Sequence, residues 1–280
     1  MGECSVDEHR ARLVRAKTGA GVFYGVVEGD RVLLAGARWP WDRPDWTAYL
    51  HGEGPCPRNL PYIPLGEAEL LCPVEPTKVV AVGLNYRDHA REVGAALPQE
   101  PVLFLKPATS VVGPGEPVVL PAVSRRVDYE AELAVVIGRR ARQVTVGQAP
   151  DCMLGFTCGN DVTARDLQQK DGQWTRSKSF DTFCPLGPWV VPGLDPSALQ
   201  VICRVNGQVR QRGNTRELIF TVAELVSFVS EVMTLEPGDV LLTGTPAGIG
   251  PLQPGDTVEV EVEGVGVLVN PVKIVVDTPS

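Results

Sequence analysis

Glu130 and Glu132 stand one residue apart at the start of an apolar run that continues to Gly138. The run predicts a β-strand, in which residues i and i+2 point to the same face. Both glutamates then share one face, and the opposite face is apolar, made of Tyr129, Ala131, Leu133, Val135 and Ile137. Two like charges about 7 Å apart along a strand repel each other, and burial would disfavour both ionised forms. A divalent cation between them would remove this conflict, whereas a solvated edge strand could carry the same pair without one. The spacing alone leaves both interpretations open.

The composition is that of an ordinary soluble globular protein. The 280 residues suffice for one or two domains with a large core. Hydrophobic residues make up 44% of the chain and charged residues 21%. Because no basic block offsets the net charge of −8, we expect neither nucleic acid nor an anionic membrane as a partner.

The lack of a recognisable targeting signal and the pattern of cysteines indicate a cytoplasmic location. No apolar run approaches the roughly 18 residues of a membrane span. The first nine residues are too acidic for a signal peptide. The seven cysteines are odd in number and contain no Cys-x-x-Cys, so they give neither a disulfide framework nor a zinc-ribbon spacing.

Two units are predicted along the chain: a small β-rich N-terminal domain over residues 1–75 and a larger domain over residues 76–280. Within the larger unit, Pro-Gly-Asp turns at 237–239 and 254–256 precede short strands. One helix is clearly marked, because Thr221 is a good N-cap and Glu224 completes a capping box. Strands dominate and do not alternate regularly with helices, which favours an α+β fold.

A third carboxylate, Asp161, closely follows a strand predicted over residues 153–157. Three carboxylates completed by water satisfy a hard ion such as Mg²⁺ or Mn²⁺. Such a site needs no histidine or cysteine, which argues against zinc. Asp161 could equally be an N-cap or Asx-turn residue, a common role for aspartate before threonine.

His89 is the histidine best placed to move a proton. We expect Asn85 to cap a short helix that ends before Gly94, with His89 and Glu92 at positions i and i+3 of one face. A carboxylate beside an imidazole can orient it as an acid, a base or a holder of water. The helix has few apolar residues, so it is either a surface helix or a mobile lid over a site.

Two further segments carry polar groups. Lys178 could neutralise an anionic substrate or a developing enolate, or could be an ordinary surface lysine. The glycine-rich segment 243–250 lacks the ending of a P-loop and does not lead into a helix, so nucleotide binding is not expected. Its backbone N–H groups and threonine hydroxyls could hold a carboxylate.

Taken together and in this order, these segments resemble the fumarylacetoacetate hydrolase family over residues 78–272. The matching segments are 128–133, 160–168, 178–181 and 244–248. The resemblance implies a C-terminal domain similar to a mixed β-sheet roll, of α+β class, that commonly forms homodimers.

The resemblance also implies roles for individual residues. Glu130, Glu132 and Asp161 match the family's Mg²⁺/Mn²⁺ ligands, and Lys178 matches a lysine that faces the substrate oxygens. Arg165 and Gln168 match positions near bound substrate, and Thr245 matches a contact to the substrate carboxylate. His89 and Glu92 match the His-x-x-Glu pair on the lid helix of acylpyruvase and oxaloacetate decarboxylase members. Fumarylacetoacetate hydrolases themselves place this pair differently, so fumarylacetoacetate is not the expected substrate.

The expected function is therefore Mg²⁺- or Mn²⁺-dependent C–C bond hydrolysis of an acylpyruvate-like 2-oxo acid or its enol. The alternative is an isomerase or decarboxylase of 2-hydroxyhepta-2,4-diene-1,7-dioate or 5-carboxymethyl-2-oxo-hex-3-ene-1,7-dioate in aromatic catabolism. A second alternative is a non-catalytic binding protein that keeps the fold. A single enolate chemistry serves hydrolysis, decarboxylation and isomerisation, so the sequence leaves them open.

Overall fold

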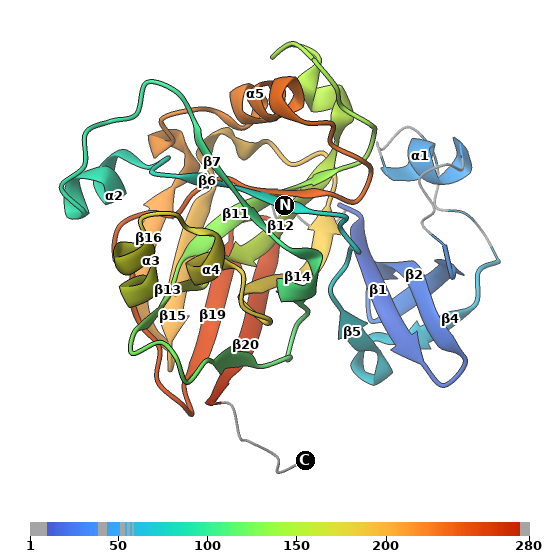
Figure 1. The fold of residues 1–280 in the computed structure, drawn as a ribbon. Helices are drawn as coiled ribbons and strands as arrows, with labels where there is room; N and C mark the ends of the chain where they lie inside the picture. Colours follow the sequence, from blue (N-terminus) through green and yellow to red (C-terminus); the bar gives the residue numbers. More distant parts are fainter. Residues whose placement is uncertain (1–9, 39–43, 51–53, 55–56, 58, 275–280) are drawn as a thin grey trace, which may run out of the picture.

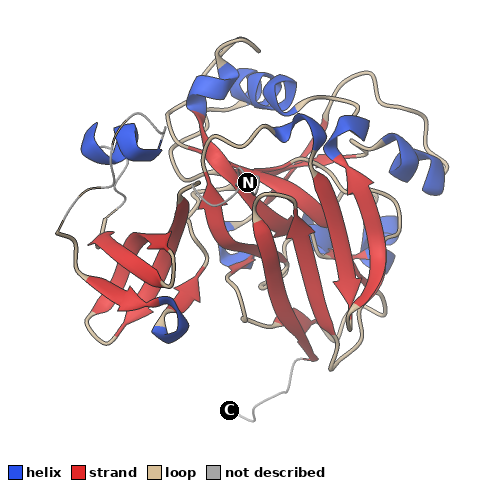
Figure 2. Ribbon diagram, turned by 180° about the vertical axis from the view of Figure 1, so that it is seen from behind, coloured by secondary structure: helices blue, strands red, loops and turns tan. Residues whose placement is uncertain are grey.

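A computed structural model of the chain describes residues 10–38, 44–50, 54, 57 and 59–274. Within these ranges the strands form three sheets, and short helices lie around their edges and faces (Figures 1 and 2). Both parallel and antiparallel strand pairs occur, for example β17 (Val240–Leu242) parallel to β6 (Val79–Gly83). The predicted α+β class, with a mixed and strand-rich fold, is confirmed.

The largest sheet has twelve strands and extends from the N-terminal part of the chain to the main body. Its main path runs in the order β4 (Tyr62–Pro64), β3 (Arg31–Gly36), β2 (Gly21–Glu28), β1 (Arg12–Thr18), β14 (Cys184–Val191), β12 (Met153–Asn160), β11 (Ala131–Ile137), β17, β6 and β7 (Val102–Lys106). Two more strands join it from the side, β5 (Glu69–Leu71) beside β1 and β8 (Val111–Val112) beside β14.

A five-stranded sheet packs against the main sheet and gives the body its rolled shape (Figure 2). Its order is β16 (Gln208–Asn214), β15 (Gln200–Val205), β19 (Thr257–Val262), β20 (Gly266–Ile274) and β9 (Val118–Leu120). A small third sheet, β13 (Thr163–Ala164), β10 (Val127–Tyr129) and β18 (Gly250–Pro251), lies near the start of β11.

The helices are short. In the described part of the chain they are α1 (Pro44–Leu50), α2 (Arg87–Glu92), α3 (Arg165–Asp171), α4 (Thr175–Lys178) and α5 (Val222–Val232). The predicted capping box on Thr221 and Glu224 is present at the start of α5 and is confirmed. None of the helices in these ranges has the length and apolarity needed to cross a membrane.

Strand β11 lies in the centre of the body, with β12 on one side and β17 on the other. All its residues are buried, because Leu133, Val135 and Ile137 pack into one hydrophobic cluster and Ala134 and Val136 into another. The apolar alternation was predicted correctly, but the alternative of a solvated edge strand is wrong. A strand covered on both faces reads as a continuous apolar run, as this segment does.

The N-terminal strands β1 to β5 lie beside the main body and contact it through β1 and β14, with Leu13 opposite Val190 (Figure 1). Strands β2 and β3 pair antiparallel as a hairpin, with Glu28 opposite Arg31. The five described cysteines are buried and free, in line with the absence of a disulfide framework, while Cys4 and Cys56 lie outside the described residues.

Asp239 fixes the junction between β17 and β6. Its fully buried carboxylate accepts hydrogen bonds from the backbone N–H groups of Thr77, Lys78 and Glu236, and it pairs with the Lys78 ammonium. Asp239→Ala would leave these donors without a partner, so we expect the free energy of unfolding to fall by about 3 kcal/mol. Urea unfolding followed by circular dichroism measures the effect. Asp30→Ala, at a side chain that is 96% exposed, is the control, and an equal midpoint in both variants would contradict the role of Asp239.

Candidate metal centre

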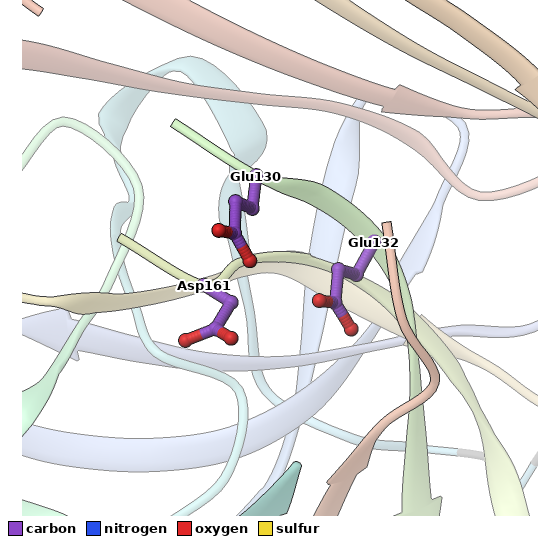
Figure 3. Close-up of side chains that lie close together, drawn as sticks. All are labelled: Glu130, Glu132 and Asp161. Atoms are coloured by element: carbon purple, nitrogen blue, oxygen red, sulfur yellow. The ribbon is translucent and has the colours of Figure 1, made fainter. Parts of the chain in front are cut away.

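Strand pairing brings Glu130, Glu132 and Asp161 together. Glu130 lies between β10 and β11, Glu132 belongs to β11, and Asp161 directly follows β12, the antiparallel neighbour of β11. The Asp161 N–H donates to the Glu130 carbonyl oxygen over 2.9 Å, which fixes the two residues opposite each other. Each side chain offers a carboxylate oxygen, and these oxygens lie within 4.8 Å of one another (Figure 3). At least 95% of the surface of each of the three residues is buried.

The alternatives that sequence left open for these residues are wrong. The predicted strand breaks at Glu130, but both glutamates are buried, and neither lies on a solvated edge. The carboxylate of Asp161 contacts two lysines, Lys106 and Lys178, rather than backbone N–H groups of a helix or turn. Lys178 is 2% exposed, so it is not a surface lysine.

Two buried ammonium groups neutralise part of the carboxylate charge. The Lys178 Nζ lies 3.0 Å from Glu130 Oε2 and 2.5 Å from Asp161 Oδ2. The Lys106 Nζ lies 2.6 Å from the other oxygen of Asp161, Oδ1. Sequence reasoning missed Lys106. Its only signal is a lysine at the end of an otherwise apolar strand, followed by a proline.

The charges of the site perturb its acids in opposite directions. Burial opposes ionisation of Glu130, but Lys178 and Arg165 outweigh it and hold the pKa of this carboxyl well below its ordinary value. Burial and the neighbouring charges of Asp161 and Glu130 raise the pKa of Glu132 well above its ordinary value. Burial disfavours the charged form of Lys178, yet Asp161 and Glu130 raise its pKa.

The residues present fit a hard divalent cation. Glu132 accepts a hydrogen bond from the backbone N–H of Gly244 over 2.6 Å, and among the described residues no cationic side chain pairs with it. It is therefore a buried carboxylate with excess negative charge beside it. An all-oxygen set of this kind suits Mg²⁺ or Mn²⁺, and the positive charge would relieve the repulsion within the cluster.

Arg165 and Gln168 lie on α3, next to the carboxylates. The Arg165 guanidinium donates to Asp128 Oδ2 over 2.9 Å, to Gln168 Oε1 over 2.7 Å, and to Glu130. Asp128 is fully buried and pairs with Arg126 as well. The guanidinium is thus held in a fixed orientation by three acceptors at the edge of the site.

His89 and Glu92 lie on α2, as predicted. The His89 Nδ1 is 2.9 Å from Glu92 Oε2, and the other oxygen of Glu92 accepts from the Gly248 N–H over 2.9 Å. Asp88 accepts from the Ala247 N–H over 3.3 Å. Two carboxylates of α2 therefore attach the helix to the segment 243–250.

The prediction that Asn85 caps α2 is wrong, because Tyr86 occupies the N-cap position without a side-chain cap. Asn85 is fully buried, and its amide instead donates to the carbonyl oxygens of Phe220 and Thr243 and accepts from the Phe220 N–H. These partners are about 135 to 158 residues away in the chain, so local capping rules did not reveal them.

The glycine-rich segment 243–250 forms an irregular loop after β17 and does not lead into a helix, as expected. Its N–H groups do hold carboxylates, but those of Glu132, Asp88 and Glu92 within this protein. The Thr245 hydroxyl donates to the Ala131 carbonyl oxygen over 2.8 Å. Gly248 has φ of 102°, and a Cβ there would lie 2.4 Å from the Arg210 carbonyl oxygen, so only glycine fits.

A cavity of about 180 Å³ opens over the carboxylates. Of the nine candidate site residues from the sequence analysis, eight line this cavity: His89, Glu130, Glu132, Asp161, Arg165, Gln168, Lys178 and Thr245. The ninth, Glu92, does not line it and contacts His89 instead. The remaining wall is apolar, made of Val82, Leu84, Val93, Phe104 and Trp174, with Gly83 between them. The lining of the cavity therefore combines charged side chains with hydrophobic and aromatic ones.

The aromatic wall is firmly packed. Phe104 and Trp174 meet edge to face with ring centroids 5.2 Å apart, and the Lys178 Nζ lies 4.8 Å from the Phe104 ring centroid. A Cβ on Gly83 would lie 2.6 Å from the Trp174 ring, so the indole needs a glycine at this position.

Known proteins are similar to this chain over most of its length. Residues 78–273 match the protein family described as fumarylacetoacetate (FAA) hydrolase C-terminal. The mitochondrial oxaloacetate tautomerase FAHD2A of Homo sapiens is 46% identical over 227 residues, which are 76% of this chain and 72% of that protein.

Two solved structures are similar along almost the whole chain. The 2-hydroxyhepta-2,4-diene-1,7-dioate isomerase of Mycobacterium marinum is 43% identical with a TM-score of 0.83, covering 94% of this chain and 98% of that one. The maleylpyruvate hydrolase of Sphingobium sp. SYK-6, solved with a manganese(II) ion and pyruvate, is 33% identical with a TM-score of 0.76, covering 94% of this chain and 99% of that one.

Proposed function

Because this chain belongs to the fumarylacetoacetate hydrolase family and is an enzyme, we propose that it is a divalent-cation-dependent hydrolase of a short acylpyruvate-like 2,4-dioxo acid. The single observation that supports this most is the buried set of Glu130, Glu132 and Asp161 beneath a cavity that also contains His89 and Lys178. A 2-oxo acid presents a carboxylate and an adjacent oxygen, which suits a hard cation on one side and the ammonium of Lys178 on the other.

Glu130, Glu132 and Asp161 would hold Mg²⁺ or Mn²⁺, whose Lewis acidity would stabilise negative charge on the 2-oxo group. Lys178 adds a second positive charge next to the same oxygens. The substrate carboxylate and its other oxygens would bind to Arg165, Gln168 and Thr245, which line the cavity. A hydrogen bond between Arg165 and Gln168 fixes these two side chains relative to each other.

His89 would act as the base for the attacking water. Glu92 holds its Nδ1 side, so the other ring nitrogen is left for water or substrate. Water attacks the C4 carbonyl, the C3–C4 bond breaks, and its electron pair becomes the enolate of pyruvate. Protonation of C3 then completes the products, pyruvate and the acid derived from the acyl group.

The apolar wall supports a short uncharged tail rather than a second carboxylate. Arg165 and Lys178 already contact carboxylates of the site, although the Lys178 Nζ lies 4.8 Å from the Phe104 ring centroid, and among the described residues no further lysine or arginine lines the cavity. A second carboxylate placed there would lose its hydration without gaining a partner. A seven-carbon dioate is therefore the less suitable substrate.

The second candidate is keto–enol tautomerisation of a small 2-oxo acid such as oxaloacetate. It is supported by the 46% identity to an oxaloacetate tautomerase and by the His89–Glu92 pair, which could move a proton without any attacking water. The same cation and Lys178 would stabilise the shared enolate.

The expected result with acetylpyruvate is acetate and pyruvate in the presence of Mg²⁺ and neither product with EDTA. Proton NMR of the purified protein measures both products, and Mg²⁺ without protein serves as the blank. If the protein leaves acetylpyruvate intact but accelerates the enol-to-keto conversion of oxaloacetate, the hydrolase proposal is wrong and the tautomerase is the function. No turnover of either compound with Mg²⁺ or Mn²⁺ would contradict the proposal.

We also propose a boundary near residue 75 between a small N-terminal domain and a catalytic domain of residues 76–280, a cytoplasmic location, a homodimer and a place in aromatic catabolism. The boundary and the location rest on sequence patterns, and the homodimer and the place in catabolism rest on the resemblance to the family. Size-exclusion chromatography with light scattering would test the homodimer.

A further inference from the structure

Lys106 contacts the candidate metal site through Asp161 but lies outside the cavity. It ends β7, is fully buried, and donates to Asp161 Oδ1 over 2.6 Å and to the Val162 carbonyl oxygen over 3.2 Å. It does not line the cavity, whereas Asp161 and Lys178 do. Lys106 therefore cannot touch a substrate held in the cavity, and its influence passes through Asp161.

Each of the three carboxylates has one oxygen that is held by a donor other than Lys178. Arg165 and Thr163 hold Glu130 Oε1, the Gly244 N–H holds Glu132 Oε2, and Lys106 holds Asp161 Oδ1. This leaves one oxygen of each: Glu130 Oε2, Glu132 Oε1 and Asp161 Oδ2. The Lys178 ammonium contacts two of these remaining oxygens, Glu130 Oε2 and Asp161 Oδ2, which therefore lie close together.

One remaining oxygen per carboxylate suits Mg²⁺ better than Ca²⁺. Mg²⁺ and Mn²⁺ take six oxygens in an octahedron, so three protein oxygens leave three positions for water or substrate. Ca²⁺ takes six to eight oxygens and commonly binds a carboxylate through both. A site whose carboxylates cannot offer a second oxygen therefore disfavours the larger ion.

We infer that Lys106 is a positioning residue that sets the metal selectivity of the site, by holding Asp161 Oδ1 so that only Oδ2, on the side of Lys178, remains for a cation. This rests on the proposed function only in that a divalent cation binds the three carboxylates. Lys106 can be replaced without altering the backbone, as a change at Gly244 would require, or the cavity lining, as a change at Arg165 would require.

The test is metal affinity rather than turnover, with Lys106→Met removing both the charge and the hydrogen bond. Isothermal titration calorimetry with MgCl₂ and with CaCl₂ gives the two dissociation constants of each protein. We expect the preference for Mg²⁺ over Ca²⁺ to fall about tenfold, because Asp161 becomes free to offer both oxygens. Lys106→Gln, whose amide keeps a donor without the charge, should retain more of the preference.

Lys78→Met is the matched control, since it also removes a lysine from a buried aspartate, Asp239, but outside the metal site. It should destabilise the fold and leave the Mg²⁺/Ca²⁺ ratio unchanged. An unchanged ratio in Lys106→Met, with wild-type binding intact, would overturn the role of Lys106 alone. Absence of Mg²⁺ and Mn²⁺ binding to the wild type would overturn the proposed function itself.

Discussion

Glu132→Gln is expected to reduce metal-dependent turnover about a thousandfold or more while the protein remains folded. The substitution keeps the size of the side chain and removes one of three negative charges that would hold the cation. Loss of several kcal/mol of charge stabilisation in the transition state corresponds to this factor, at about 1.4 kcal/mol for each tenfold. Without divalent cation the variant should be no less stable than the wild type, because it removes repulsion between Glu132 and its neighbours Asp161 and Glu130.

Steady-state kinetics at saturating Mg²⁺ and thermal unfolding in EDTA measure the two effects. Glu217→Gln, at an exposed glutamate outside the cavity, is the control for the loss of one acidic group. Wild-type turnover in Glu132→Gln would remove Glu132 from the metal site. Loss of turnover together with a collapsed fold would point to a structural role instead.

His89→Ala is expected to lower kcat by about 10² to 10⁴ and to leave the affinity for Mn²⁺ unchanged. The imidazole would supply proton transfer in the transition state, which has this magnitude in enzymes. It is not among the residues of the carboxylate cluster, which are Glu130, Glu132 and Asp161. Glu92→Gln should produce a smaller loss, because the amide can still hold the His89 ring in place but lacks the negative charge of the carboxylate.

Kinetics and Mn²⁺ titration followed by electron paramagnetic resonance separate these expectations. Arg87→Ala is the control, because Arg87 is exposed on the same helix α2. Unchanged kcat in His89→Ala would exclude it as the base. A parallel fall in kcat and in Mn²⁺ affinity would show that α2 supports the metal site rather than the proton transfer.

The parts of the fold that sequence predicted are those set by local pattern. The alternation after Glu130 placed the two glutamates on one face, and the capping box on Thr221 and Glu224 placed the start of α5. Both depend on residues a few positions apart. The burial of β11 on both faces was not predicted, because it depends on strands that are distant in the sequence.

The parts of the candidate site that sequence missed are long-range contacts. Lys106 reaches Asp161 across 55 residues, and Asn85 reaches Thr243 across 158. No spacing rule connects such positions, since only the pairing of the strands brings them together. The resemblance to the family singled out Asp161 and Lys178, but it did not indicate what lies behind Asp161.

The most direct test of the central claim is a crystal structure from crystals soaked in MnCl₂, with diffraction recorded on both sides of the manganese absorption edge. We predict one anomalous peak between Glu130, Glu132 and Asp161, about 2 Å from one oxygen of each. The claim would be contradicted by a peak elsewhere, or by the absence of a peak in crystals of a protein whose turnover requires Mn²⁺.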